Sequence, residues 1–107
     1  ISYVTDAAFT GENVRRIKAI AGGADLLFIE ATFLHAERDK AFWKRHLTAR
    51  QAGWLARWAG AKRMVLFHFS PKYRGLEREI LAEAEAAFRG EDVPEPAVEG
   101  PAGNRSA

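Results

Sequence analysis

Three short apolar runs alternate along the chain with longer stretches in which apolar residues recur at helical spacing. The runs Ile1–Val4, Leu26–Ile29 and Arg63–Phe67 are β-prone or continuously apolar, which is typical of strands in a buried sheet. The stretches that follow each run carry apolar residues three and four positions apart, which indicates amphipathic helices. The pattern therefore predicts three strands, each followed by a helix.

Local signals mark where these helices begin and end. Thr10 and Thr48 are suited to cap two helix N-termini, and Gln51 completes a capping box with Thr48. Glycines at positions 22, 60 and 90 are expected to end the three helices. The expected core-facing positions are Val14, Ile17, Ala21, Ala52, Leu55, Ala56, Ala59, Leu76, Ile80, Leu81, Ala84, Ala87 and Phe88.

Two stretches lack this periodicity. Residues 32–45 are charged and irregular, so we expect an exposed and partly helical loop there, with His35 structural or exposed to solvent. Residues 91–107 hold three of the four prolines, and we expect a disordered, acidic, proline-rich tail. Residues 1–90 then form a partial α/β domain in β-α-β-α-β-α order, with a mostly parallel sheet whose edges need a partner.

The composition of the chain restricts the metal ligands and the partners that it can have. The chain has 107 residues without cysteine, so any metal must be held by His, Asp or Glu. It has no apolar run long enough to span a membrane and no signal-peptide pattern, and its start within a strand suggests part of a larger fold. The formal charge is −3 over residues 91–107 and +5 over residues 1–90, which favours a polyanionic partner without requiring one.

Polar residues with useful chemistry stand at the strand ends. Asp6, Glu30 and His68 follow the three strands, and His46 lies just before the cap Thr48. In α/β proteins ligands bind at this end of the sheet. Asp and His suit zinc, and a histidine near a helix N-terminus suits phosphate contact and proton transfer. Asp6 and His68 are too few for a tetrahedral site, so the residues predict half of a metal site.

Between about residues 1 and 88 the chain carries four motifs: Thr5-Asp6, Glu30-Ala31-Thr32-Phe33, His46-Leu47-Thr48 and His68-Phe69-Ser70-Pro71-Lys72-Tyr73. Together, and in this order, they resemble the ribonuclease Z family, the tRNA 3′-endonucleases of the metallo-β-lactamase superfamily. The resemblance is to the C-terminal part of such an enzyme. It implies that residues 1–90 are the C-terminal half of a metallo-β-lactamase-type αββα sandwich.

The resemblance also implies a function and roles for individual residues. The complete enzyme would be a zinc-dependent phosphodiesterase that hydrolyses an RNA phosphodiester, with precursor tRNA as substrate. Asp6 would bridge two zinc ions and His68 would bind the second. His46 would contact the scissile phosphate and help to protonate the leaving 3′ oxygen, with Glu30 orienting it. Weaker substrate-binding candidates are Thr48, Ser70, Lys72 and Tyr73. The family implies a cytoplasmic homodimer, and we expect Trp43, Trp54 and Trp58 to be packing residues, for which a dimer surface is one location.

The chain departs from the family pattern at several positions. It has Thr5-Asp6-Ala7 where the family usually has Gly-Asp-Thr, and Ile29 where a histidine usually precedes Glu-Ala-Thr. The His-X-His-X-Asp-His motif and the tRNA-gripping arm are absent, so we expect this chain to be inactive alone. Two alternatives remain open: a metallo-β-lactamase-fold hydrolase of a small ester or phosphodiester, and a non-catalytic α/β interaction module.

Overall fold

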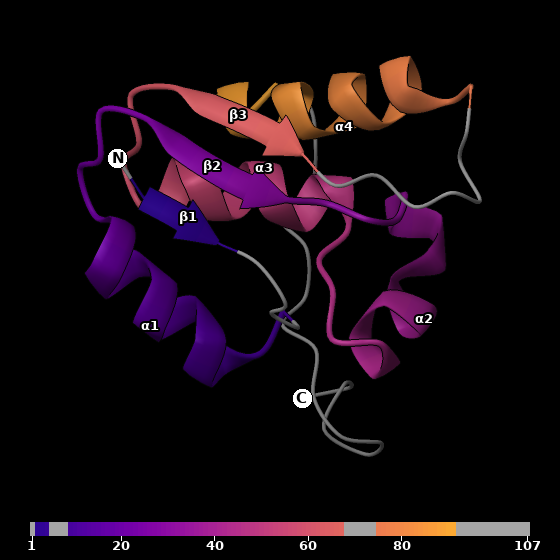
Figure 1. Ribbon diagram of the computed structural model, residues 1–107, viewed down its shortest axis with the longest axis horizontal. Helices are drawn as coiled ribbons and strands as arrows, with labels where there is room; N and C mark the ends of the chain where they lie inside the picture. The colour runs from indigo at the N-terminus through magenta and orange to yellow at the C-terminus, as the bar shows by residue number, and fades with distance from the viewer. Residues whose placement is uncertain (1, 5–8, 68–74, 92–107) are drawn as a thin grey trace.

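The structure is a computed structural model, and it describes residues 2–4, 9–67 and 75–91 of the chain. Its strands β1 (Ser2–Val4), β2 (Leu27–Glu30) and β3 (Met64–Phe67) form one sheet in that order. Both neighbouring pairs are parallel (Figure 1). The predicted parallel sheet is therefore confirmed, with β2 as its central strand.

The helices are more numerous than the sequence pattern predicts. The three expected helices are α1 (Gly11–Ala21), α3 (Ala49–Trp58) and α4 (Glu77–Arg89). Two short segments, η1 (His35–Glu37) and α2 (Arg38–Trp43), lie between β2 and α3. The predicted β-α-β-α-β-α order is thus incomplete, and the described residues follow the order β1-α1-β2-η1-α2-α3-β3-α4.

Residues 32–45 are helical in part, as expected, and half of them are exposed, but the prediction of exposure fails at the buried positions. Ala41 of α2 is fully buried, and His35 of η1 is only 8% exposed. A six-residue helix with one buried side chain has too few core positions to produce a periodic pattern. Ala41 belongs to the core cluster, and packing of this kind leaves no local trace in the sequence.

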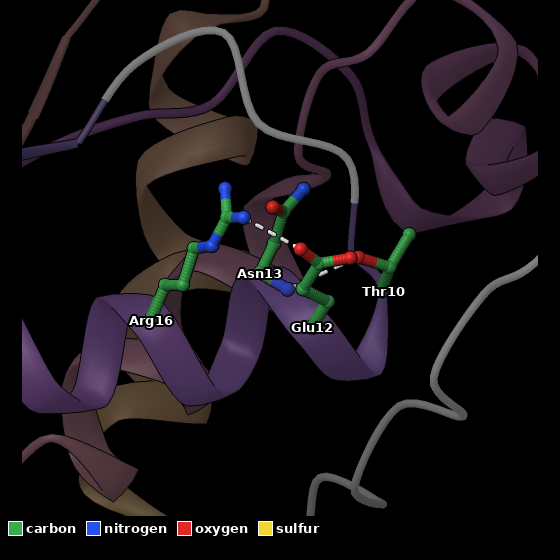
Figure 2. Close-up of polar contacts among 4 residues, drawn as sticks. All are labelled: Thr10, Glu12, Asn13 and Arg16. Carbon is green, nitrogen blue, oxygen red and sulfur yellow. Dashed lines mark hydrogen bonds and ion pairs between the residues drawn. The ribbon is translucent and has the colours of Figure 1, made fainter.

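Local capping explains where α1 begins and where α4 ends. Thr10 Oγ1 accepts a hydrogen bond from the backbone N–H of Asn13 at 3.1 Å, and the next turn holds an ion pair between Glu12 and Arg16 (Figure 2). Gly90 adopts the left-handed conformation, with φ of 71°, that glycine reaches without a steric penalty. Both predicted helix boundaries are confirmed.

The hydrophobic core lies between one face of the sheet and the helices α1, α3 and α4. Leu27 and Ile29 of β2 are fully buried in one cluster with residues of all three helices. Figure 1 shows α3 behind the sheet, with α4 alongside β3. Most predicted core positions are buried, whereas Leu76 and Leu81 are exposed, contrary to the prediction.

The other face of the sheet is also apolar. Because side chains alternate along a strand, Phe28, Val65 and Phe67 point away from the face formed by Leu27 and Ile29. Phe28 and Phe67 are half-buried, and Val65 is 38% exposed. Glu30 lies on this same face, at the carboxyl end of β2.

The tryptophans have different environments. The rings of Trp54 and Trp58 lie 5.8 Å apart, and Trp58 also stacks on Phe9 at 5.8 Å. Their predicted packing role is confirmed. Trp43 at the end of α2 is 68% exposed and contacts Phe42 edge to face, so it is not a core residue. Among the described helices none is both long and apolar enough to cross a membrane.

Candidate active site

A buried carboxylate at the end of β2 contacts a histidine from the loop before α3. Glu30 is 1% exposed, and its Oε2 accepts a hydrogen bond from the hydroxyl of Thr32 at 2.9 Å. The same oxygen lies against Nδ1 of His46. Burying a carboxylate is costly unless it is paired, and these contacts supply partners for it. The structure therefore brings together two residues that the sequence singled out separately.

The contact with Glu30 orients the imidazole of His46. With Nδ1 directed at the carboxylate, Nε2 is the ring nitrogen that remains for another partner. The side chain of His46 is 23% exposed, so the ring is partly accessible, and it lies 6.3 Å from the ring of Phe33. An oriented, accessible imidazole backed by a carboxylate can act as a general acid or base.

The backbone before His46 is fixed by the end of α2. The N–H of His46 donates to the carbonyl of Ala41 at 2.8 Å, and the N–H of Arg45 donates to that of Phe42 at 3.0 Å. This pair of bonds is a Schellman motif, in which the residue after the cap takes a left-handed conformation. That residue is Arg45, with φ of 61°, although glycine is usually preferred there. The turn that delivers His46 is thus a strained one.

The backbone after His46 runs alongside the segment that follows β2. Phe33 and Thr48 form an isolated parallel bridge. The N–H of Thr32 donates to the carbonyl of Leu47 at 3.1 Å, and the N–H of Ala49 donates to that of Phe33 at 2.8 Å. These bonds join the motif that carries Glu30 to the motif that carries His46. They explain why residues 16 positions apart in sequence meet at one site.

Thr48 begins α3 through the capping box that the sequence predicts. Its Oγ1 accepts from the N–H of Gln51 at 3.1 Å, and its own N–H donates to Oε1 of Gln51 at 2.9 Å. The same hydroxyl lies 2.9 Å from Nδ1 of His35. Thr48 is fully buried, and its hydroxyl is occupied by these two partners. Its contact with substrate stays a prediction.

His35 is a buried neutral histidine. Burial, together with the smaller effects of the nearby guanidinium groups of Arg50 and Arg38, lowers the pKa of His35 to about 4. At neutral pH the ring is therefore uncharged. The expectation that His35 is structural is supported, and the alternative that it is exposed is wrong.

The remaining predicted site residues lie outside the described residues. They are Asp6 and His68, predicted to bind metal, and Ser70, Lys72 and Tyr73, predicted to bind substrate. Within residues 2–4, 9–67 and 75–91, no three His, Asp or Glu side chains gather as a metal site would require. The tail predicted for residues 91–107 also falls almost entirely outside the description and stays a prediction.

Sequence reasoning missed one residue beside the site. Glu83 of α4 reaches across to the segments around His46, where its Oε1 accepts from the backbone N–H groups of His35 at 2.9 Å and Arg50 at 3.2 Å. The only local sign was its position between the core-facing residues Ile80 and Ala84. A glutamate so placed looks like any solvated helix residue.

A groove elsewhere on the surface is not part of this site. It has a volume of about 320 Å³ and lies between β3 and the C-terminal half of α4. Two of its cations are paired, Lys62 with Asp25 at 3.2 Å and Arg89 with Glu91 at 2.9 Å. None of the predicted site residues lines it; the lining residues are Leu26, Lys62, Arg63, Met64, Val65, Glu85, Phe88 and Arg89.

Comparison with known proteins gives one consistent result. No protein-family model matches the chain. Among curated proteins, ribonuclease Z of Thermobifida fusca (strain YX) is 50% identical over 93 residues, which cover 86% of this chain and 28% of the relative. Ribonuclease Z of Prochlorococcus marinus (strain MIT 9303) is 40% identical over 92 residues, and that of Porphyromonas gingivalis (strain ATCC BAA-308 / W83) is 38% identical over 88 residues.

Fold and site together define a parallel α/β domain with an imidazole–carboxylate pair at the carboxyl end of its central strand. Over most of its own length, the chain is similar in sequence to curated proteins that are all named ribonuclease Z. It spans about 28% of the length of the curated relatives that it matches. The family resemblance of the four motifs is therefore confirmed.

Proposed function

We propose that this chain is part of a zinc-dependent endoribonuclease that hydrolyses an RNA phosphodiester, with precursor tRNA as its substrate. The observation that carries the proposal is the contact of His46 with the buried carboxylate of Glu30, in a chain whose relatives are named ribonuclease Z. Because the match covers only about 28% of those relatives, the activity is proposed for the full-length protein. This chain alone is proposed to be inactive.

In the proposed reaction His46 acts on the leaving group. It lies two residues before the cap of α3, at the end of that helix whose dipole favours a phosphate. Its Nε2 contacts the scissile phosphate and donates a proton to the leaving 3′ oxygen. Glu30 holds the ring through Nδ1, so that Nε2 points at the phosphate. Cleavage leaves a 3′-hydroxyl on the tRNA side.

Zinc binding by Asp6 and His68 is part of the proposal. Carboxylate and imidazole are both ligands that zinc accepts, so Asp6 and His68 would hold the metal. Two side chains are fewer than the four ligands of a tetrahedral site, so the other ligands must come from elsewhere in the full-length protein. Bound zinc supplies an activated water for hydrolysis.

The remaining expectations extend the same proposal. The sheet is one half of a metallo-β-lactamase-type αββα sandwich, and the apolar face with Phe28, Val65 and Phe67 packs on the second sheet. Ser70, Lys72 and Tyr73 contact RNA. The full-length protein is a cytoplasmic homodimer, and the exposed Trp43 is available for the contact between subunits.

The test is a pH–rate profile of precursor-tRNA cleavage by the full-length protein and its His46→Ala variant. A general acid contributes about 10²–10⁴-fold, so kcat should fall by that order and the loss of activity at high pH should disappear. Lys44→Ala, an exposed neighbour, is the control and should keep the wild-type profile. An unchanged rate and profile in His46→Ala would rule out the proposed role.

The same protein separates the alternatives. If small diesters were cleaved as fast as precursor tRNA, the small-substrate hydrolase would be favoured. If Asp6→Ala and His68→Ala both folded and left the function intact, the chain would be a non-catalytic interaction module. Loss of cleavage with retained folding in both variants is the expected result.

A further inference from the structure

We infer that Glu83 is a positioning residue, which together with His35 fixes the segment that presents His46. The inference deepens the proposed function, because it assigns a role to a helix that contributes no residue to the reacting groups. It begins with one carboxylate oxygen of α4 that binds two backbone segments at once. Glu83 Oε1 accepts from the N–H of His35, at the start of η1, and from the N–H of Arg50, in the first turn of α3.

These two amides need an acceptor. The first N–H groups of a helix have no partner within that helix, and a buried unpaired donor is costly. Thr48 Oγ1 satisfies the amide of Gln51, and Glu83 satisfies the amide of Arg50 just before it. A carboxylate here also interacts favourably with the N-terminal end of the α3 dipole. The first turn of α3 is therefore completed by a residue 33 positions further along the chain.

The bonded segments are the two that enclose the site. His35 follows the Phe33 bridge, and Arg50 follows Thr48 on the other side of the same bridge. The ring of His35 closes the arrangement through its 2.9 Å contact with Thr48 Oγ1. His46 lies two residues before this anchored point, and its backbone has little freedom once Thr48 and Arg50 are held.

Close helix packing explains why Glu83 can reach both amides. Ala84, the next residue of α4, lies so near Gly53 that a side chain on Gly53 would collide with its carbonyl oxygen. Gly53 lies one turn after Arg50 on α3. The contact between the helices therefore sets the distance from the Glu83 carboxylate to the first turn of α3, and through it the position of His46.

The test measures amide hydrogen exchange and the ring nitrogen chemical shifts of His46 by NMR in the 107-residue chain. In Glu83→Ala the amides of His35 and Arg50 should exchange about tenfold faster or more, since each loses a bond to a charged acceptor. The His46 ring shifts should move, because its contact with Glu30 changes. Glu85→Ala removes an exposed glutamate from the same helix and should change neither reading.

Each other outcome has a defined meaning. Wild-type exchange at both amides in Glu83→Ala would overturn the inference. Faster exchange with unmoved His46 ring shifts would also overturn it, because Glu83 would then stabilise the fold without positioning His46.

If Glu83→Ala does not fold, Glu83→Gln keeps a neutral and weaker acceptor and should show smaller changes of the same sign. Failure of both variants to fold would contradict a role confined to the site. Neither amide exchange nor the His46 ring shifts require RNA or zinc. Their outcome is therefore independent of the precursor-tRNA cleavage test.

Discussion

Gly53 of α3 lies against the backbone of Ala84 of α4, so closely that a Cβ on Gly53 would come within 2.1 Å of the Ala84 carbonyl oxygen. Glycine in a helix interior normally costs stability relative to alanine. Here its lack of a side chain allows the two helices to meet. The residue thus belongs to the packing of α3 on α4.

Gly53→Ala should destabilise the chain despite the better helix propensity of alanine. We expect a loss of about 1–3 kcal/mol in the free energy of unfolding, because the new methyl group overpacks a backbone contact. Denaturant unfolding measures it. A Cβ on Gly53 would also lie 2.7 Å from the Cβ of Ala87, which Ala87→Gly removes. Because the clash with the Ala84 carbonyl oxygen remains, the double variant Gly53→Ala/Ala87→Gly should not recover the lost stability. Full recovery would show that the backbone contact is not limiting.

Thr48→Ala should cost about 1–2 kcal/mol in unfolding free energy, because it removes the N-cap of α3 and leaves the amide of Gln51 without its acceptor. Thr48→Ser is the matched control, since it keeps the hydroxyl and should retain most of the stability. Thermal unfolding of both variants at neutral pH checks the difference. Equal losses in the two would mean that the methyl group, and not the hydroxyl, matters here.

His35 should make stability depend on pH. Its pKa is about 4 in the folded chain and about 6.5 in the unfolded chain, so the unfolded state takes up the proton first as the pH falls. The associated stability is complete above pH 6.5 and is lost as the pH falls to 4, by up to about 3 kcal/mol. His35→Asn keeps a polar atom near Thr48 and cannot titrate in this range. The two unfolding curves should converge toward acid pH, and a constant difference would contradict the prediction.

Arg45 should be replaceable with a gain in stability. Its left-handed backbone, φ 61°, costs a residue with a side chain about 1 kcal/mol relative to glycine. Arg45→Gly should therefore stabilise the chain by up to that amount. Lys44→Gly is the control, because Lys44 has φ of −92° and should only lose backbone order. A loss of stability in Arg45→Gly would mean that its side chain makes a compensating contribution.

The parts of the fold that could be predicted are those with local causes. Thr10, Thr48 and Gly90 act on amides and carbonyls a few residues away, so their roles are legible in the sequence. Apolar spacing likewise identifies the core faces of α1 and α3. In α4 the spacing is less reliable: Leu81 fits the apolar pattern, but its side chain is 40% exposed.

The candidate site was only partly predictable, because it is formed by contacts between residues that are distant in the sequence. Glu30 and His46 were recognised through their motifs, but their contact depends on backbone bonds between Phe33 and the residues around Thr48. The burial of His35 depends on Thr48 and on Glu83, which lies 48 positions away. No periodicity or motif links those residues, so only the three-dimensional arrangement reveals them.

The long sequence separation between His35 and Glu83 has a consequence for synthesis. A ribosome synthesises residues 35 to 50 before α4, so the His46 segment is made before the carboxylate that binds its flanking amides. Contacts this distant also form late, because the intervening chain must first close a long loop. Nascent chains should therefore order the surroundings of His46 only after α4 has docked. Until then this stretch is exposed to chaperones and proteases.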